Sequence, residues 1–435
     1  MPQLSCSVLI RPRLSNFMDR GCVVFFAIVG ILIAWRTPTA DLIADGPNGG
    51  IIYPFERSIH PFFKARDPSN STPILRSSGI ALRKEVIIGY FGPSKSDDLG
   101  MASLWWAAQR GLDDAQRELH DKLPPCRLVP LIKDSPWSDG ASALAELIFR
   151  ENVVGVVGGT DGEATHLAET IVAKVHLPLL SPVATDKTTN LAGVPWIFAL
   201  APGDHLIAPV LAQRIAGSCP RRIAVLLGSD HDSQWFWREL SKWLLRHGCP
   251  VNSVIILPRE EQAVTKAVWE SLENSPEWLI VSAPQPLLVS IIREIRRHTS
   301  TVQIVCDARV SRVDALKLLG LDAEGIICPC LIPDSCHIPQ DFRETFQKEF
   351  GVEPDYAVAL TYDAVRMLLH AVARAAQGGR DNIDRVEIYN SLLAISPYRG
   401  VFGTIEWDRV NANKCSVVPG VIRNGKIIPE VPLSR

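Results

Sequence analysis

From Glu85 onward, short apolar runs alternate with amphipathic stretches of helical length, and this alternation constrains the fold more than any other feature of the sequence. Runs that are apolar throughout predict strands covered on both faces, as in parallel sheets flanked by helices. The expected strands are Val86–Tyr90, Cys126–Ile132, Val153–Val157, Leu179–Ser181, Ile223–Leu227, Val251–Leu257, Trp278–Val281, Ile304–Cys306 and Gly325–Cys328. The expected helices include Leu99–Leu119, Asp139–Arg150, Glu163–Val175, His205–Ala216, Gln234–His247, Glu261–Leu272 and Pro286–His298. Right-handed crossovers then predict a doubly wound α/β fold.

The series is too long for one sheet, and the chain of 435 residues has room for two or three domains. We therefore expect two successive sheets, within residues 85–200 and 203–325. A long helix, Asp355–Gln377, and a closing segment of strands and turns, Ser396–Pro432, are expected to follow. Residues 41–84 are rich in Pro and Gly and show no sustained periodicity, which predicts a linker.

The N-terminus is typical of an export signal. Basic residues precede an uncharged run over Gly21–Trp35, and Arg36 closes it. The run is shorter than the roughly 20 residues of a spanning helix, and small residues follow it. We predict that residues 1–40 are a signal peptide cleaved before Asp41. The alternative is an uncleaved anchor with a membrane tether at residues 22–35. Either form places the protein in the periplasm or elsewhere outside the cytoplasm.

Charge and motifs exclude several classes of function. The net charge is −2 and no stripe of Lys and Arg occurs, so no nucleic-acid partner is expected. The sequence contains no nucleophile elbow, zinc-protease helix or kinase motif set, which predicts that the protein is not an enzyme. His231 lies between Asp230 and Asp232, a setting that would suit a catalytic histidine. The two acids, however, fit turn and helix-cap positions better than a catalytic role.

Two groups of cysteines are candidates for a metal site or a disulfide. Cys328, Cys330, Cys336 and His337 lie close together in sequence, but their spacing fits no zinc pattern, so pairing of Cys330 with Cys336 or simple burial is favoured. No metal and no cofactor is predicted. Cys219 and Cys249 each precede an apolar run, and a disulfide between them is feasible if the two strands are neighbours in the sheet.

Two strand-to-helix junctions are candidates for a binding site. They are Gly155–Gly162 and Leu179–Thr185. Ligands of open parallel sheets bind beyond the carboxyl ends of the strands. We therefore expect one cleft to be faced by Thr160, Asp161, Gly162, Val183 and Thr185. The alternatives are a glycine turn that only reverses the chain and a helix-capping role for Thr185. Trp105 is a candidate aromatic wall of the cleft, although core packing would equally explain it.

The chain resembles the type 1 periplasmic binding proteins, in particular the leucine/isoleucine/valine-binding branch, over about residues 85–430. The resemblance is carried by the order of Val86–Pro93, Gln109–Ala115, Asn152–Gly159, Leu177–Thr185, Arg222–Leu226, Asp322–Ile326, Tyr356–Ala371 and Tyr398–Asp408. It implies two Rossmann-like lobes with parallel sheets that close around a ligand. Lobe 1 would hold residues 85–200 plus 331–396, and lobe 2 residues 203–327 plus 400–432. Three hinge crossings would lie near Phe198–Gly203, Ile327–Pro333 and Ser396–Thr404.

The resemblance also implies a ligand site. In amino-acid binders of the family, loops of the first lobe hold the ligand's carboxylate and amino groups. The matching positions here are Thr160-Asp161-Gly162 and Val183-Ala184-Thr185. The second lobe contributes an aromatic residue and an acid, whose positions fall near Gln285 and Asp307. This chain departs from the pattern, because Asp161 and Glu163 would repel a carboxylate and Pro284-Gln285 replaces an aromatic residue.

We therefore expect an amino acid or another small amine-bearing ligand, bound for an uptake transporter of the ABC type with its membrane permease. The first alternative is a membrane-anchored sensory receptor on the same fold. The second, ranked last, is an enzyme that uses the acids Asp161, Glu163 and Asp307.

Overall fold

The computed structural model describes residues 80–81, 85–132, 136–151, 153–186, 194–257, 263–332, 338–377 and 382–430. The predicted signal or anchor, its membrane tether at 22–35, nearly all of the predicted linker and the Cys336-His337 pair lie outside these residues. Within the described part of the chain, no helix is long and apolar enough to cross a membrane.

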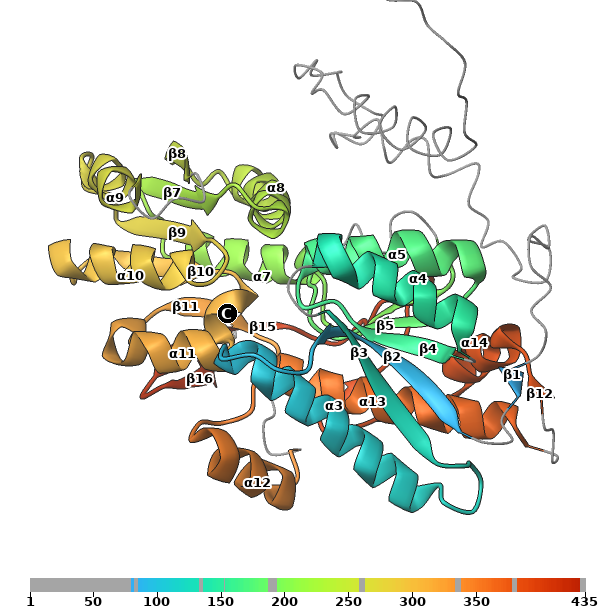
Figure 1. The fold of residues 1–435 in the computed structure, drawn as a ribbon. Helices are drawn as coiled ribbons and strands as arrows, with labels where there is room; N and C mark the ends of the chain where they lie inside the picture. The colour runs from blue at the N-terminus through green and yellow to red at the C-terminus, as the bar shows by residue number, and fades with distance from the viewer. Residues whose placement is uncertain are drawn as a thin grey trace, which may run out of the picture. The chain divides into compact units, whose positions relative to one another are not determined.

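The first sheet confirms the predicted parallel α/β arrangement. Its strands are β2 (Val86–Pro93), β3 (Cys126–Ile132), β4 (Val153–Gly158), β5 (Leu179–Ser181) and β6 (Ile197–Ala199). Their order is β3-β2-β4-β5-β6, and every neighbouring pair is parallel (Figure 1). We call this sheet and the helices packed on it the first lobe.

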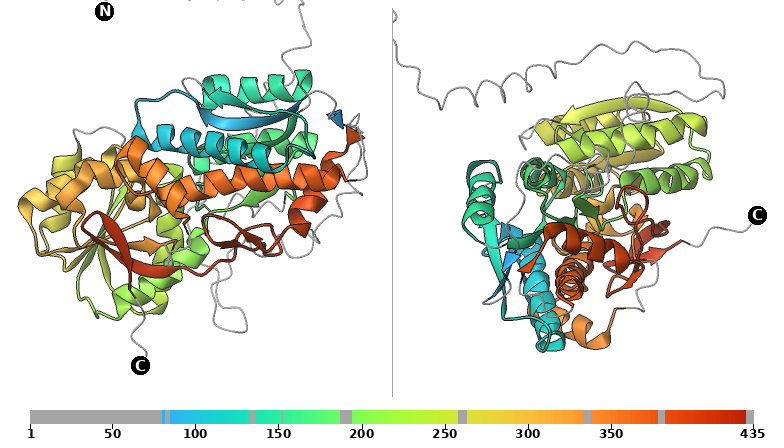
Figure 2. Two further views of the ribbon diagram at one scale, coloured as in Figure 1. Left: turned by 90° about the horizontal axis from the view of Figure 1, so that it is seen from below. Right: turned by 90° about the vertical axis from the view of Figure 1, so that its right-hand side faces the viewer.

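Helices cover both faces of this sheet, which explains why its strands are apolar throughout. The helices are α3 (Leu99–Glu118) and α13 (Tyr356–Ala375) on one face, and α4 (Ala141–Arg150) and α5 (Gly162–Val175) on the other. Figure 2 shows α3 and α13 side by side under the sheet. Along β2, Ile88 and Tyr90 pack toward α3 and α13, whereas Ile87 and Phe91 pack toward α4 and α5.

The second sheet, with its helices, forms the second lobe. Its strands are β7 (Ile223–Gly228), β8 (Val251–Leu257), β9 (Trp278–Ser282), β10 (Gln303–Cys306), β11 (Ile327–Cys330), β15 (Val418–Arg423) and β16 (Lys426–Pro429), in the order β16-β15-β11-β10-β9-β7-β8. Strands β7 to β11 are parallel, and β15 and β16 add an antiparallel edge. Its helices are α7 (Asp204–Ala216), α8 (His231–Arg246), α9 (Val264–Leu272), α10 (Leu287–His298) and α11 (Val313–Leu319).

Short elements complete the described chain. They are β1 (Ile80–Ala81), α12 (Gln340–Phe350), β12 (Asn382–Ile383), α14 (Arg385–Ala394), β13 (Tyr398–Arg399), β14 (Thr404–Ile405) and the helical turns Pro136–Gly140, Ala308–Ser311 and Gly320–Ala323. The rings of Phe342 and Phe346 on α12 contact the ring of Trp106 on α3, at centroid distances of 5.4 and 5.2 Å. This contact attaches α12 to the first lobe.

The chain passes between the two sheets after β6, after β11 and before β15. The third passage lies further along the chain than residues 396–404, where the resemblance placed it. The buried carboxylate of Asp363 on α13 accepts the backbone N–H groups of Val401 and Phe402, at 2.9 and 2.8 Å, which holds this segment in the first lobe. The amide of Asn413 then donates to the Leu200 carbonyl at 2.9 Å, so the first and last passages run side by side.

The described cysteines carry free thiols. The strands β7 and β8 that follow Cys219 and Cys249 are parallel neighbours, which meets the condition set for a disulfide, but the structure contains no bond between the two residues. Cys328 and Cys330 are buried on β11.

Candidate solute-binding cleft

A cavity of about 450 Å³ lies where the carboxyl ends of the strands of both lobes meet. This volume suits a small-molecule ligand. The lining residues include Asp98, Thr160, Asp161, Glu163, Val183, Ala184, Thr185, Asp230, His231, Asp232, Phe236, Gln285, Asp307, Arg309, Arg312, Asp314 and Tyr356.

The structure brings most of the predicted site residues together. The residues that line the cavity are Thr160, Asp161, Val183, Ala184 and Thr185 from the first lobe and Gln285 and Asp307 from the second. Gly162 does not line it but donates its backbone N–H to Asp232 across the cavity mouth, at 3.0 Å. Trp105 is not among the lining residues, and its ring packs on Tyr90 with centroids 5.1 Å apart.

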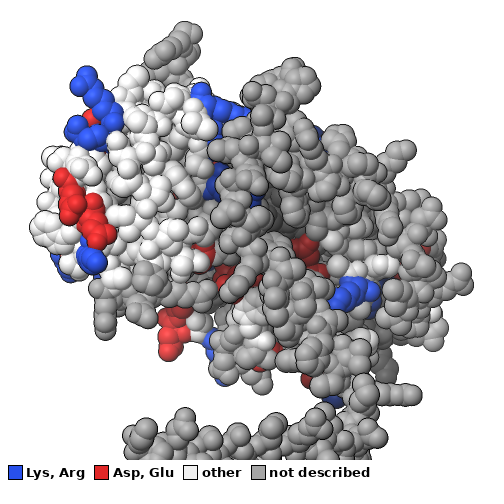
Figure 3. All heavy atoms as spheres, turned by 90° about the horizontal axis from the view of Figure 1, so that it is seen from above, with Lys and Arg blue, Asp and Glu red and all other residues white. Residues whose placement is uncertain are grey.

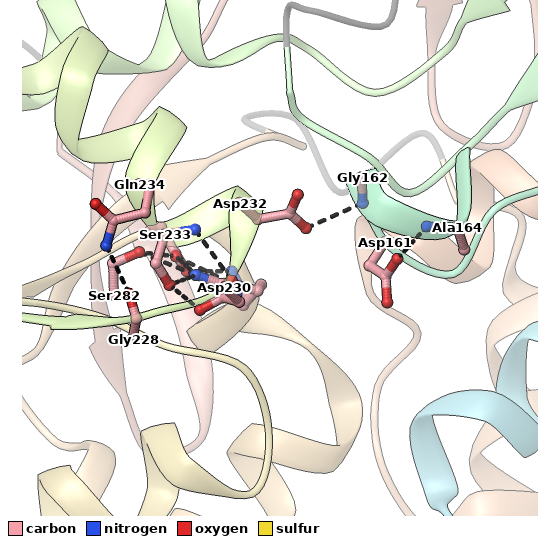
Figure 4. A network of polar contacts seen from close by, with 11 residues as sticks. Asp161, Gly162, Ala164, Gly228, Asp230, Asp232, Ser233, Gln234 and Ser282 are labelled. Carbon is pink, nitrogen blue, oxygen red and sulfur yellow. Dashed lines mark hydrogen bonds and ion pairs between the residues drawn. The ribbon is translucent and has the colours of Figure 1, made fainter. Parts of the chain in front are cut away.

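Two helix caps place acidic side chains at the cavity (Figure 4). Asp161 follows β4 and caps α5, where its Oδ1 accepts the Ala164 N–H at 2.7 Å. Asp230 follows β7 and caps α8, where its Oδ1 accepts the Ser233 N–H at 3.1 Å. Helix N-termini have unpaired donors that favour anions, so each carboxylate is stabilised where its strand ends.

The backbone acceptors of the second predicted loop are already engaged. The Val183 carbonyl accepts the Tyr356 hydroxyl at 3.3 Å, and the Thr185 carbonyl accepts the Asp204 N–H at the start of α7 at 2.7 Å. These bonds fix the loop against α13 and α7.

Arg309 is the main residue that sequence reasoning missed. It lies on the turn Ala308–Ser311, directly after β10. Its guanidinium donates to Asp307 at 2.6 Å, to Asp230 at 2.8 Å, and to the hydroxyls of Ser233 and Ser282 at 2.7 and 2.9 Å. Burial lowers the pKa of Arg309, but the carboxylates of Asp307 and Asp230 outweigh burial and hold this pKa above its ordinary value.

Asp307 was expected to contact a ligand amine. In the structure its Oδ2 accepts the Ser282 hydroxyl at 2.6 Å in addition to the Arg309 guanidinium. Its charge is therefore compensated within the protein.

Asp232 and Asp161 lie in a different environment from Asp307. The Oδ1 atom of Asp232 is buried and accepts no hydrogen bond from the described residues, although its Oδ2 accepts the Gly162 N–H. Burial raises the pKa of Asp232 to about 7, with attraction to Arg309 opposing and repulsion from Asp161 adding to this shift. Burial also raises the pKa of Asp161, with its bond to Ala164 opposing and the charge of Glu163 adding.

The balance of charge in the cavity is acidic. Among the residues that the structure describes, seven carboxylates and two guanidinium groups line it. Both guanidinium groups are paired, Arg309 with Asp307 and Asp230, and Arg312 with Asp355 at 3.0 Å. On the face shown in Figure 3, the described Lys and Arg side chains and the described Asp and Glu side chains both lie in small separate groups.

Gln285 supplies neutral polar atoms. It follows β9 and lines the cavity, and both its amide oxygen and its amide nitrogen are buried with no hydrogen-bond partner in the described part of the chain. An unpaired buried amide costs roughly 1–3 kcal/mol, which a ligand with a matching donor and acceptor would offset.

A second polar cluster joins the lobes beside the cavity. Nε2 of His166 on α5 and Nε2 of His231 on α8 lie 2.7 and 2.6 Å from the same Oδ2 of Asp186. Nδ1 of His166 lies 3.2 Å from Glu169. Burial lowers the pKa of His166, but the hydrogen bonds to Asp186 and Glu169 outweigh it and raise this pKa to about 10. Sequence reasoning missed this cluster because its members lie far apart along the chain.

A family model described as a periplasmic binding protein matches residues 90–416. The chain belongs to the periplasmic binding protein family. Membership confirms the resemblance and the fold class, and it agrees with the prediction of a binding protein without enzymatic activity. It also implies a location outside the cytoplasm.

Solved structures share this fold. The leucine binding protein LivK of Thermotoga maritima is 19% identical, with a TM-score of 0.68, over 80% of this chain and 98% of its own. LivJ of Streptococcus pneumoniae, in complex with isoleucine, is 18% identical, with a TM-score of 0.66, over 79% of this chain and 98% of its own. A solute binding protein of R. palustris in complex with benzoate is 15% identical, with a TM-score of 0.66, over 80% of this chain and 95% of its own. A search of curated proteins found no match.

Proposed function

We propose that this periplasmic binding protein delivers an amino acid or a related small amine-bearing solute to an ABC-type permease. The observation that carries the proposal is the acidic balance of the described lining residues, since both guanidinium groups among them are already paired within the protein. An anionic ligand such as benzoate would meet uncompensated negative charge, whereas an ammonium group would relieve it.

In this proposal, the ammonium group of the ligand lies between Asp161 of the first lobe and Asp232 of the second. Both carboxylates line the cavity, and both have a pKa raised above that of an ordinary carboxyl, so their ionised forms gain most from a nearby cation. The hydrogen bond from the Gly162 N–H to Asp232 joins the residue next to Asp161 to the second lobe.

The remainder of the ligand lies against Gln285, Thr160 and Thr185. The amide of Gln285 offers N–H donors and an acceptor oxygen, which suits a ligand carboxylate or amide. Val183 and Ala184 add apolar contact, and Asp307 acts by holding Arg309 rather than by touching the amine.

A thermal-shift screen of the purified protein tests this function, because a ligand that binds only the folded state raises Tm. The panel holds amino acids, their amides, polyamines, dicarboxylates and benzoate. We expect amine-bearing compounds to raise Tm. Stabilisation by the anions alone would overturn the proposal.

A further inference from the structure

The cluster of His166, Asp186 and His231 is not used by the proposed solute site. One ligand atom from each residue can be chosen such that all three lie within 4.8 Å of one another. His166 and Asp186 belong to the first lobe, and His231 begins α8 of the second lobe. The two imidazole rings meet edge to face, with centroids 4.9 Å apart, so both Nε2 atoms point at one carboxylate oxygen.

We propose that His166, Asp186 and His231 bind one divalent transition-metal ion with the ligand preferences of Zn²⁺, and that this ion bridges the two lobes. Two imidazole nitrogens and one carboxylate oxygen form a donor set that Zn²⁺ and its neighbours favour over Mg²⁺ or Ca²⁺. Bonds of about 2.0–2.2 Å in tetrahedral geometry place ligand atoms about 3.4 Å apart. The nitrogen–oxygen contacts of 2.7 and 2.6 Å would have to open by about 0.7 and 0.8 Å to admit the ion.

Glu169 is an independent feature that fits a metal site. Its Oε2 lies 3.2 Å from Nδ1 of His166, the ring nitrogen that would not bind the ion. Metal-binding histidines usually direct this second nitrogen to a carboxylate, which fixes the ring and makes the binding nitrogen more basic. Glu169 is itself buried, so its carboxylate is held in place beside the ring.

The burial of Asp186 and the partial exposure of the two histidines also fit a metal site. The side chain of Asp186 is 1% exposed, so the charged ligand is shielded from water, which strengthens its attraction to a cation. The side chains of His166 and His231 are 29% and 34% exposed, which leaves a path for the ion and a coordination position for water.

The bridge would affect lobe closure. The site is complete only when α8 lies against α5 as in this structure, so the ion stabilises the arrangement that also joins Asp232 to Gly162. A ligand shifts a two-state equilibrium by its difference in affinity for the two states. The ion and a solute bound between the lobes should therefore raise each other's affinity, a step that rests on the proposed function.

The test uses the full-length protein without a polyhistidine tag, stripped with a chelator and titrated with Zn²⁺ in a calorimeter. We expect one ion per chain, a Tm raised by Zn²⁺ but not by Mg²⁺, and a visible absorption spectrum of bound Co²⁺ that reports nitrogen and oxygen ligands. No binding, or a Co²⁺ spectrum of the free aquo ion, overturns the proposal and leaves only a hydrogen-bonded histidine–aspartate contact.

Variants separate the site from adventitious binding. His166→Gln and His231→Gln keep an N–H donor toward Asp186 but lose the metal ligand, and each should weaken Zn²⁺ binding by at least about 100-fold. Glu169→Gln should weaken it about tenfold, as for other outer partners of metal ligands. The matched control is His247→Gln, since His247 is exposed just after α8. Unchanged binding in both ligand variants contradicts the site, whether or not the solute screen succeeds.

Discussion

Arg309 and Asp230 form an ion pair of 2.8 Å between residues that are 79 positions apart in the sequence. Arg309 also binds Asp307 at 2.6 Å, so one guanidinium joins the carboxyl ends of β7 and β10 at the base of the cavity. This largely buried pair orders the second-lobe half of the cleft before any ligand binds.

Replacement of Arg309 by Met should destabilise the protein by about 3–5 kcal/mol, because it leaves two buried carboxylates without a partner. Urea denaturation followed by circular dichroism measures the loss. Arg297→Met is the control, since Arg297 is 71% exposed and should show little change. A loss as small as that of the control would show that the network does not hold the second lobe together.

Asp161→Asn should weaken binding of an amine-bearing solute by about tenfold or more while the fold persists, because Asn caps a helix as well as Asp does. Titration calorimetry on the best compound of the screen measures this effect. Asp113→Asn, at an exposed position of α3, controls for the general loss of a carboxylate. Equal losses in both variants would argue against a direct contact with Asp161.

Acidification should weaken amine binding. The pKa of Asp161 is raised, mainly by burial, so this group takes up its proton at a higher pH than an ordinary carboxyl. The ammonium ligand prefers the ionised form, and affinity should therefore fall as the pH is lowered through the raised pKa of Asp161, before ordinary carboxyl groups take up their protons. The Asp161→Asn variant should show a flatter profile. Tighter binding in acid would point to an anionic ligand instead.

Gly400→Ala should destabilise the first lobe by about 1–3 kcal/mol through overpacking. A Cβ at Gly400 would lie 2.3 Å from the carboxylate of Asp363, which is buried and holds Val401 and Phe402. Thermal unfolding measures the change. Gly217→Ala is the matched control, because its Cβ would meet no atom closer than 3.4 Å.

The mature N-terminus separates export from anchoring. We predict a protein that begins near Asp41, and N-terminal sequencing of material from its native host measures this directly. An intact residue 1 would instead support the membrane-anchored receptor. The fold and the cavity are common to both outcomes.

Strands and the helices between them were predictable because burial on both faces leaves a strong local pattern. β3, β5 and β8 have the bounds expected from their apolar runs, and most helices differ only at their ends. The short helix α12 was not predicted, since its attachment depends on the rings of Phe342 and Phe346 reaching Trp106 on a distant helix.

The sequence predicted only those cleft residues that lie at the ends of recognisable strands. Asp161 and Thr185 lie at strand ends, and the rule that ligands bind there brought them to the cavity. Arg309 was missed because its position two residues after Asp307 does not reveal that it also reaches Asp230. The last passage between the lobes was expected too early because the bonds from Asp363 to residues 401 and 402 join segments distant in sequence.

The central claim is that a solute with an ammonium group binds between Asp161 and Asp232. Calorimetric titration of the wild-type protein and of Asp161→Asn with the most stabilising compound from the screen tests it most directly. The account predicts one amine-bearing molecule bound per chain, with affinity reduced at least about tenfold in the variant. An anionic compound that binds both proteins equally would contradict it.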